Sequence, residues 1–152
     1  MTARTTTLSK TDLDLISRFH GHLCPMVLLG ARSAKKARME VPGGDGDAAL
    51  FGYYRGYGCA VDGIQIFSGC TTGNSNLVLL RGRNFAFLLT TEGALEGIMI
   101  TPRPSLLEQI QGQSSPEARS DLMSRIQNAP DSELFLSETI KDLGAISLFP
   151  GD

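Results

Sequence analysis

The residues best suited to do chemistry in this chain lie close together, because both of its histidines and one of its three cysteines fall between His20 and Cys24. Imidazole nitrogen suits zinc, iron or nickel, and thiolate sulfur suits zinc or iron. An extended segment would turn positions 20, 22 and 24 to one face, whereas in a helix only His20 and Cys24 would share one. The cluster predicts a transition-metal site, and a structural role for these side chains stays open as the alternative.

The residues around these ligands predict a break between two helices. Gly21 favours a turn, and Pro25 removes a backbone hydrogen bond and disfavours helical geometry at the residue before it. The pattern predicts a helix over 11–19, a turn at Gly21, and a second helix over about 25–40 that has Pro25 at its first position. Cys24 would then be the N-cap of the second helix. The helix dipole at that position favours a thiolate, so we expect a lowered pKa for Cys24.

A second cysteine is predicted at the start of another helix. Apolar residues recur every third position over 60–68, which indicates a helix with Cys59 at its N-terminal end and the same thiolate-favouring environment. Asp62 falls in the first turn of this helix, where a capping role and a role in proton transfer are both open. The following loop, 69–76, is rich in small and hydrogen-bonding residues, and it is typical of either an anion-binding nest or an ordinary tight turn.

The elements that must position these residues predict an α+β fold. We expect a single domain over 1–152, with a motif-bearing core over 12–101 and a C-terminal helical segment over 104–143. Three consecutive strands with short links indicate an antiparallel β-meander packed with helices. The expected strands are 49–55, 77–80, 85–90 and 95–101, the expected later helices are 105–111 and 116–128, and the tail 146–149 is expected to add a short strand or to dock.

Composition and charge exclude several classes of function. The chain has 152 residues, a formal net charge of −2 and a pI near 5.7, which gives no electrostatic footprint for nucleic acid or for an anionic membrane. No run of apolar residues is long enough to span a bilayer, and the first residues lack the apolar core of a signal peptide. With an odd number of cysteines, these features predict a cytoplasmic protein whose cysteines bind metal or react, rather than form disulfides.

Three segments taken together resemble the FmdE family, which is named after formylmethanofuran dehydrogenase. The resemblance covers roughly residues 12–100 in the family's order and spacing. It implies an α+β core, a tendency to form homodimers, and a His/Cys site that can hold zinc. The segments that carry it are Phe19-His20-Gly21-His22-Leu23-Cys24-Pro25, Cys59-Ala60-Val61-Asp62-Gly63-Ile64-Gln65 and Gly69-Cys70-Thr71-Thr72-Gly73-Asn74-Ser75-Asn76-Leu77.

The chain departs from the family pattern at a few positions. Met26 stands where the family usually has a glycine, and Asn74-Ser75 replaces a common Lys-Gly pair, which removes an anion contact by that lysine. Some family members carry a C-terminal zinc ribbon with paired cysteines. This chain has no cysteine after Cys70, so we expect that module to be absent.

The leading functional hypothesis is a metal centre that binds a small molecule. His22, Cys24 and Cys59 are expected as ligands, with His20 or Cys70 as the fourth. Zinc is the expected metal because the ligands mix imidazole and thiolate, and iron or another transition metal is the alternative. A metal with an open position would act as a Lewis acid. The candidate catalytic residues are Cys24, Cys59 and Asp62, and the candidates for holding an anionic ligand are Arg18 and Arg55.

Two further hypotheses stay open. Without metal, Cys24 and Cys59 could form a covalent adduct or a transient disulfide as reactive thiolates. Alternatively, the family name suggests a non-catalytic accessory subunit or metal carrier that serves a molybdenum or tungsten oxidoreductase. The sequence does not decide whether the protein is an enzyme, and it names no substrate.

Overall fold

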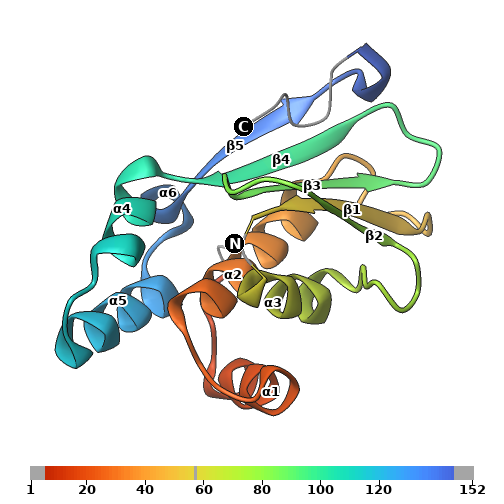
Figure 1. The fold of residues 1–152 in the computed structure, drawn as a ribbon. Coiled ribbons are helices and arrows are strands. Elements are labelled where there is room, and N and C mark those ends of the chain that lie inside the picture. The colour runs from red at the N-terminus through yellow and green to blue at the C-terminus, as the bar shows by residue number, and fades with distance from the viewer. Residues whose placement is uncertain (1–5, 57, 146–152) are drawn as a thin grey trace, which may run out of the picture.

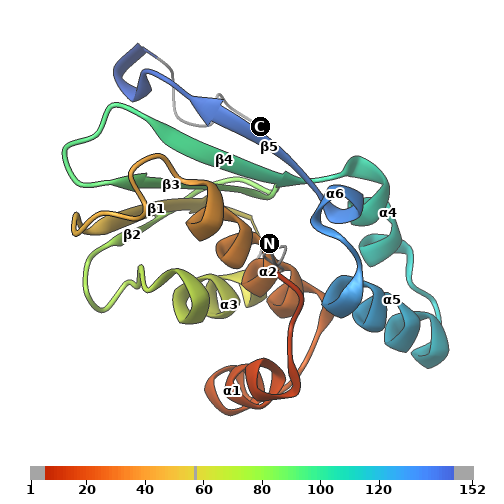
Figure 2. The same ribbon diagram turned by 180° about the vertical axis from the view of Figure 1, so that it is seen from behind.

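The structure, a computed structural model, describes residues 6–56 and 58–145. Its helices gather on one side of a five-stranded sheet, which both views show (Figures 1 and 2). None of the helices in these residues is long and apolar enough to cross a membrane. The elements are α1 (Lys10–His20), α2 (Pro25–Glu40), β1 (Leu50–Arg55), α3 (Cys59–Ser68), β2 (Leu77–Leu80), β3 (Ala86–Thr91), β4 (Gly97–Pro102), α4 (Pro104–Gly112), α5 (Pro116–Asn128), α6 (Asp131–Leu134), β5 (Phe135–Ile140) and the 3-10 turn η1 (Leu143–Ala145).

The sheet has the strand order β2-β1-β3-β4-β5 and is antiparallel except between β1 and β2. The α+β class is therefore confirmed, and the predicted antiparallel pairing of the last two meander strands is found as β3 and β4. The predicted pairing of 77–80 with 85–90 is wrong, because β1 lies between β2 and β3. Helix α3 carries the chain across from β1 to β2, and a strand that returns through a crossover helix pairs in parallel with the strand it left.

The C-terminal segment contains a strand that the sequence did not indicate. Helices α4 and α5 lie close to the expected ranges, but residues 135–140, which were expected to be helical, form β5 and pair antiparallel with β4. The residues of β5 show no clear alternation, since only its two ends, Phe135 and Ile140, are buried. The expected docking of 146–149 lies outside the described residues.

Helix α2 lies at the centre of the core, between the sheet and the other helices (Figure 2). Its close packing against α3 depends on two glycines. A Cβ added at Gly30 would lie 2.2 Å from the carbonyl oxygen of Ala60, and one added at Gly63 would lie 2.3 Å from that of Val27. No side chain fits at either position, so the two helix backbones come into direct contact.

A buried arginine ties the start of the chain to the C-terminal helices. The Arg32 side chain on α2 is fully buried, and it donates to the Thr6 hydroxyl, to the carbonyl oxygen of Ile126 on α5 and to the carboxylate of Asp131 on α6. A buried guanidinium is tolerated when its donors are paired in this way. The contacts fix α5 against α2, and α5 carries a charged residue that lies near the candidate site.

Candidate metal centre

Four side chains that can bind a transition metal meet at one end of the helical layer. Their ligand atoms, one from each of His20, His22, Cys24 and Cys59, all lie within 4.8 Å of one another. His20 ends α1, His22 lies in the turn that follows, Cys24 precedes α2, and Cys59 begins α3. The structure therefore brings together all four predicted ligands, and three of them come from a stretch of five residues.

The predicted break between the first two helices is confirmed, and it explains how the near-contiguous ligands converge. Gly21 adopts a left-handed conformation with φ of 94°, and its N–H donates to the Ser17 carbonyl, so α1 ends there. Cys24 is the N-cap of α2 in an extended conformation, with Pro25 as the first helical residue. The chain thus reverses within four residues, and the side chains at 20 and 24 come to face each other, with Cys24 Sγ 4.0 Å from His20 Nε2.

Cys59 reaches the cluster through tertiary packing. Cys24 and Cys59 stand at the N-terminal ends of α2 and α3, and the glycine contacts at Gly30 and Gly63 bring these two helices together. Cys24 is only 7% exposed, whereas His22 is exposed. The cluster is thus enclosed by packed helices on the cysteine side and open to solvent on the side of His22.

A carboxylate orients one of the two imidazoles. Asp62 Oδ2 lies 2.6 Å from His20 Nδ1, and the side chain of His20 is 10% exposed. When Nδ1 carries the proton and donates to Asp62, Nε2 is left as a lone-pair donor that faces the cluster. A carboxylate behind the remote nitrogen is the usual partner of a metal-bound histidine, since it fixes the ring and raises its basicity.

The expected lowering of the Cys59 thiol pKa is wrong for the metal-free chain. Burial raises this pKa, and the neighbouring Cys24 thiol and the Asp62 carboxylate raise it further, while the Arg119 guanidinium acts in the opposite direction. The dipole of a ten-residue helix does not outweigh these effects, because several negative or easily ionised groups share the site. A bound cation would supply the missing positive charge and favour the thiolate.

Two residues that the sequence did not single out lie close enough to Cys59 to interact with its charge. Arg119 is on α5, and Tyr54 is on β1 with its side chain 1% exposed. Burial raises the pKa of the Tyr54 phenol, and the Cys59 thiol adds to that effect. The order of the sequence offers no signal for Arg119, because the packing of α5 alone brings it to the site.

The remaining candidates lie outside the cluster. Cys70 is fully buried after the C-terminal end of α3, a helix of ten residues that separates it from Cys59 by about 15 Å at 1.5 Å per residue. It therefore does not serve as the fourth ligand of this cluster. Arg18 is exposed on α1, and Arg55 donates to the carbonyl oxygen of Asn84 at the edge of the sheet. Neither arginine is placed by a contact with the four ligands.

The loop 69–76 folds as a tight turn that uses its own donors. Oδ1 of Asn74 accepts from the backbone N–H groups of Thr71 and Asn76, and Nδ2 of Asn74 donates to the Gly69 carbonyl. The N–H of Thr72 points instead to the side chain of Gln65. With these donors already used, the turn interpretation is favoured over an anion-binding nest.

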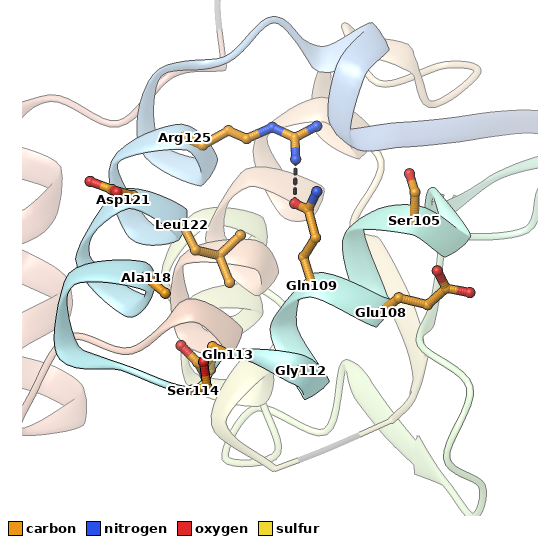
Figure 3. A pocket seen from close by; sticks show the side chains of 10 residues that line it. All are labelled: Ser105, Glu108, Gln109, Gly112, Gln113, Ser114, Ala118, Asp121, Leu122 and Arg125. Atoms are coloured by element: carbon orange, nitrogen blue, oxygen red, sulfur yellow. Dashed lines mark hydrogen bonds between the residues drawn. The ribbon is translucent and has the colours of Figure 1, made fainter.

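Two surface hollows lie apart from the four ligands. One, of about 620 Å³, lies between α4 and α5, where Arg125 donates to Gln109 (Figure 3). The other, of about 600 Å³, lies along α1 and is lined by residues that include Leu15 and Phe19. None of the four cluster residues lines either hollow, so neither hollow supports the expectation of a ligand cleft at the cluster.

The fold and the cluster together define an α+β protein with a candidate metal centre where the N-termini of two packed helices meet. The chain belongs to the FmdE family, because the family described as "FmdE, Molybdenum formylmethanofuran dehydrogenase operon" matches residues 19–136. A crystal structure of an FmdE-like protein of tungsten formylmethanofuran dehydrogenase, from Syntrophus aciditrophicus, has the same fold. Its TM-score is 0.73 at 19% identity, over 97% of this chain and 83% of that one.

A curated protein of Archaeoglobus fulgidus, named "Probable S-adenosyl-L-methionine-binding protein", is 26% identical to this chain over 132 residues. The match covers 83% of this chain and 36% of that protein. The chain thus spans about a third of the length of this curated relative.

Proposed function

We propose that the chain is a metal-binding protein that holds zinc through His20, His22, Cys24 and Cys59. The observation that carries the proposal is the convergence of four ligand atoms within 4.8 Å, from elements whose packing holds them there. In a tetrahedral zinc site with Zn–S near 2.3 Å and Zn–N near 2.0 Å, neighbouring ligand atoms lie roughly 3.3–3.8 Å apart. Side-chain movements of about 1 Å would therefore close the site, and two imidazoles with two thiolates suit zinc more than magnesium or calcium.

The proposed centre exchanges ligands on the side of His22. The other three ligands are buried or half-buried, whereas His22 is exposed and lies in the turn between two helices. A small molecule that replaces or joins His22 would meet a metal held by His20 and the two cysteines. Of the proposed catalytic residues, Cys24 and Cys59 act here as ligands, and Asp62 acts as the partner of His20. The metal, when bound, would supply Lewis acidity at the open position.

Metal content tests the proposal directly. Protein purified aerobically without chelator is expected to contain about one zinc per chain by plasma mass spectrometry, and His22→Ala and Cys24→Ala are expected to lower that content sharply. Cys70→Ala is the matched control, because it removes a buried cysteine outside the cluster and should leave the zinc content unchanged. Wild-type protein without any bound metal would contradict the proposal.

Metal-free thiol chemistry is the second candidate, favoured by the closeness of the Cys24 and Cys59 sulfurs, which belong to the same cluster. The raised pKa of Cys59 weighs against it, because a neutral thiol is a poor nucleophile. Rapid labelling of Cys24 by iodoacetamide near neutral pH, in protein that holds no metal, would favour the thiol reaction over the metal centre.

The partner that we propose for the metal centre is a molybdenum or tungsten oxidoreductase, with the chain as accessory subunit or metal carrier. The family description, which refers to a formylmethanofuran dehydrogenase operon, supports this. Copurification of a large oxidoreductase with the tagged chain tests it. S-adenosyl-L-methionine is the first small molecule to test by calorimetry, because the curated relative carries that ligand in its name.

We also propose that the chain forms a homodimer through α1. Leu15 and Phe19 on this helix are 48% and 56% exposed, and they line a surface hollow together with Asp14 and Arg18. Two antiparallel copies of α1 around a two-fold axis would place Leu15 of each copy against Phe19 of the other, and Asp14 against Arg18. A self-complementary patch of this kind is what a two-fold interface requires.

A further inference from the structure

We infer that Gln65 is a positioning residue of the proposed metal centre, which fixes Asp62 and, through Asp62, the imidazole of His20. This inference rests on the proposed function, since it concerns the same four ligands. The chain of contacts runs from Thr72 through Gln65 to Asp62 and then to His20. It links the loop after α3 to the cluster at the start of α3, along one face of that helix.

The first link is made within α3. Gln65 lies three residues after Asp62, a spacing that places two side chains on the same face of a helix. Nε2 of Gln65 donates to Oδ1 of Asp62 at 3.2 Å, while Oδ2 of Asp62 lies 2.6 Å from His20 Nδ1. The two oxygens of this carboxylate therefore have separate partners, and the carboxylate is held against rotation between them.

The second link determines which end of the Gln65 amide faces Asp62. Oε1 of Gln65 accepts from the backbone N–H of Thr72 at 3.0 Å and from the Thr72 hydroxyl at 3.3 Å. A backbone N–H can only donate, so its partner must be the amide oxygen and not the amide nitrogen. The nitrogen is then left on the side of Asp62, where it donates to the carboxylate. Thr72 thus sets the orientation that Asp62 needs.

The loop that presents Thr72 is itself held by internal bonds. Gly69 ends α3 in a left-handed conformation with φ of 73°, and Asn74 bridges backbone groups on both sides of Thr72, at Thr71 and Asn76. The loop can therefore hold the Thr72 donors in place against Gln65. This gives the third family-like segment of the sequence a role at the centre without any direct contact with a metal.

The chemical consequence concerns the tautomer of His20. An Asp62 carboxylate held in place accepts the Nδ1 proton, which leaves the Nε2 lone pair for a metal. Without Gln65, Asp62 is 32% exposed in its side chain and free to turn toward solvent. His20 would then lose its orientation and part of its basicity, and the affinity for metal would fall.

Zinc affinity, measured by competition with a chromophoric chelator, tests the inference in folded protein. Gln65→Met keeps the length of the side chain and removes both hydrogen bonds, and Gln65→Glu keeps an acceptor for Thr72 but places a second carboxylate against Asp62. We expect each variant to bind zinc about tenfold more weakly, the lower end of the effect of such partners. Gln127→Glu is the matched control, because Gln127 donates to the Leu8 carbonyl on another part of the fold, and its zinc affinity should stay at the wild-type value.

A double-mutant cycle separates positioning from a general loss of structure. In an Asp62→Ala background, Gln65→Met should cause less than a twofold further loss of zinc affinity, because Gln65 acts through Asp62. Zinc affinity of Gln65→Met within twofold of wild type would overturn the inference, and so would a tenfold loss that persists in the Asp62→Ala background. Should the Glu variant fail to fold, the Met variant and the cycle still decide.

A measurement on metal-free protein distinguishes this inference from the proposed function. Long-range ¹H–¹⁵N spectra of His20 are expected to show the Nδ1–H tautomer in the wild type and both tautomers in Gln65→Met. A wild type that binds no zinc but shows this tautomer change would refute the metal centre and leave the role of Gln65 standing. Identical His20 spectra in the wild type and Gln65→Met would refute that role.

Discussion

Gly63→Ala should damage both the fold and the metal centre, because it adds one methyl group at the closest contact between α2 and α3. The new Cβ would lie 2.3 Å from the carbonyl oxygen of Val27 and 2.5 Å from the backbone nitrogen of Ala31. These neighbours are backbone atoms, so no side chain can rotate away. To reach a normal contact of about 3.5 Å, the helices would have to separate by roughly 1 Å at this point.

The expected free energy has two opposing parts. Overpacking of this kind destabilises a core by about 1–3 kcal/mol, and the contact distance here favours the upper end. Alanine is better than glycine inside a helix by about 1 kcal/mol, which offsets part of the loss. We therefore expect a net loss of about 2 kcal/mol in the free energy of unfolding, measured by urea denaturation of metal-free protein.

The same displacement should weaken zinc binding. Gly63 lies one turn after Cys59, and Val27 lies one turn after the start of α2 at Cys24. A separation of roughly 1 Å exceeds the tolerance of about 0.2 Å in metal–ligand distances, so zinc affinity should fall at least tenfold. Gly112→Ala is the matched control, because this glycine ends α4 with no atom within 4 Å of an added Cβ. Wild-type stability and zinc affinity in Gly63→Ala would refute this account of the helix contact.

Three further changes test other contacts. Arg32→Ala leaves buried polar groups unpaired and should lower the free energy of unfolding by about 3 kcal/mol in urea. Burial alone would raise the pKa of Asp12, but hydrogen bonds from Lys35 and a backbone N–H lower it overall. Asp12→Asn should therefore cost about 1 kcal/mol at pH 7, a difference that persists above the unfolded pKa of about 3.9 and disappears as the pH falls through the lower folded value. An equal loss at pH 7 and pH 2 would contradict this assignment. Phe19→Glu should convert the proposed dimer to a monomer in light scattering, whereas Leu95→Glu, at an equally exposed position on a loop, should not; a Phe19→Glu protein that remains dimeric would exclude α1 as the interface.

The elements that local chemistry controls were predictable. The break between α1 and α2 follows from Gly21 and Pro25, whose backbone preferences act on their immediate neighbours. The start of α3 near Cys59 and its end at Gly69 follow from helix periodicity and a left-handed cap. These signals need no knowledge of the rest of the chain.

Strand order was not predictable in the same way. The sequence places the strand 77–80 immediately before 85–90, and short links favour pairing of neighbours. The structure inserts β1 between them, because α3 must cross over the sheet before the chain can return. Strand β5 was missed for a related reason, since its pairing with β4 depends on a partner far away in the sequence.

The sequence by itself determined which side chains could bind a metal, since His20, His22 and Cys24 are brought together by a turn within five residues. Only the tertiary structure decided that Cys59 joins them and that Cys70 does not. The close packing of α2 on α3 brings Cys59 to the cluster, and the length of α3 keeps Cys70 at its other end. The pKa of a thiol depends likewise on every charge around it, including those from distant elements, and local sequence carries no record of them.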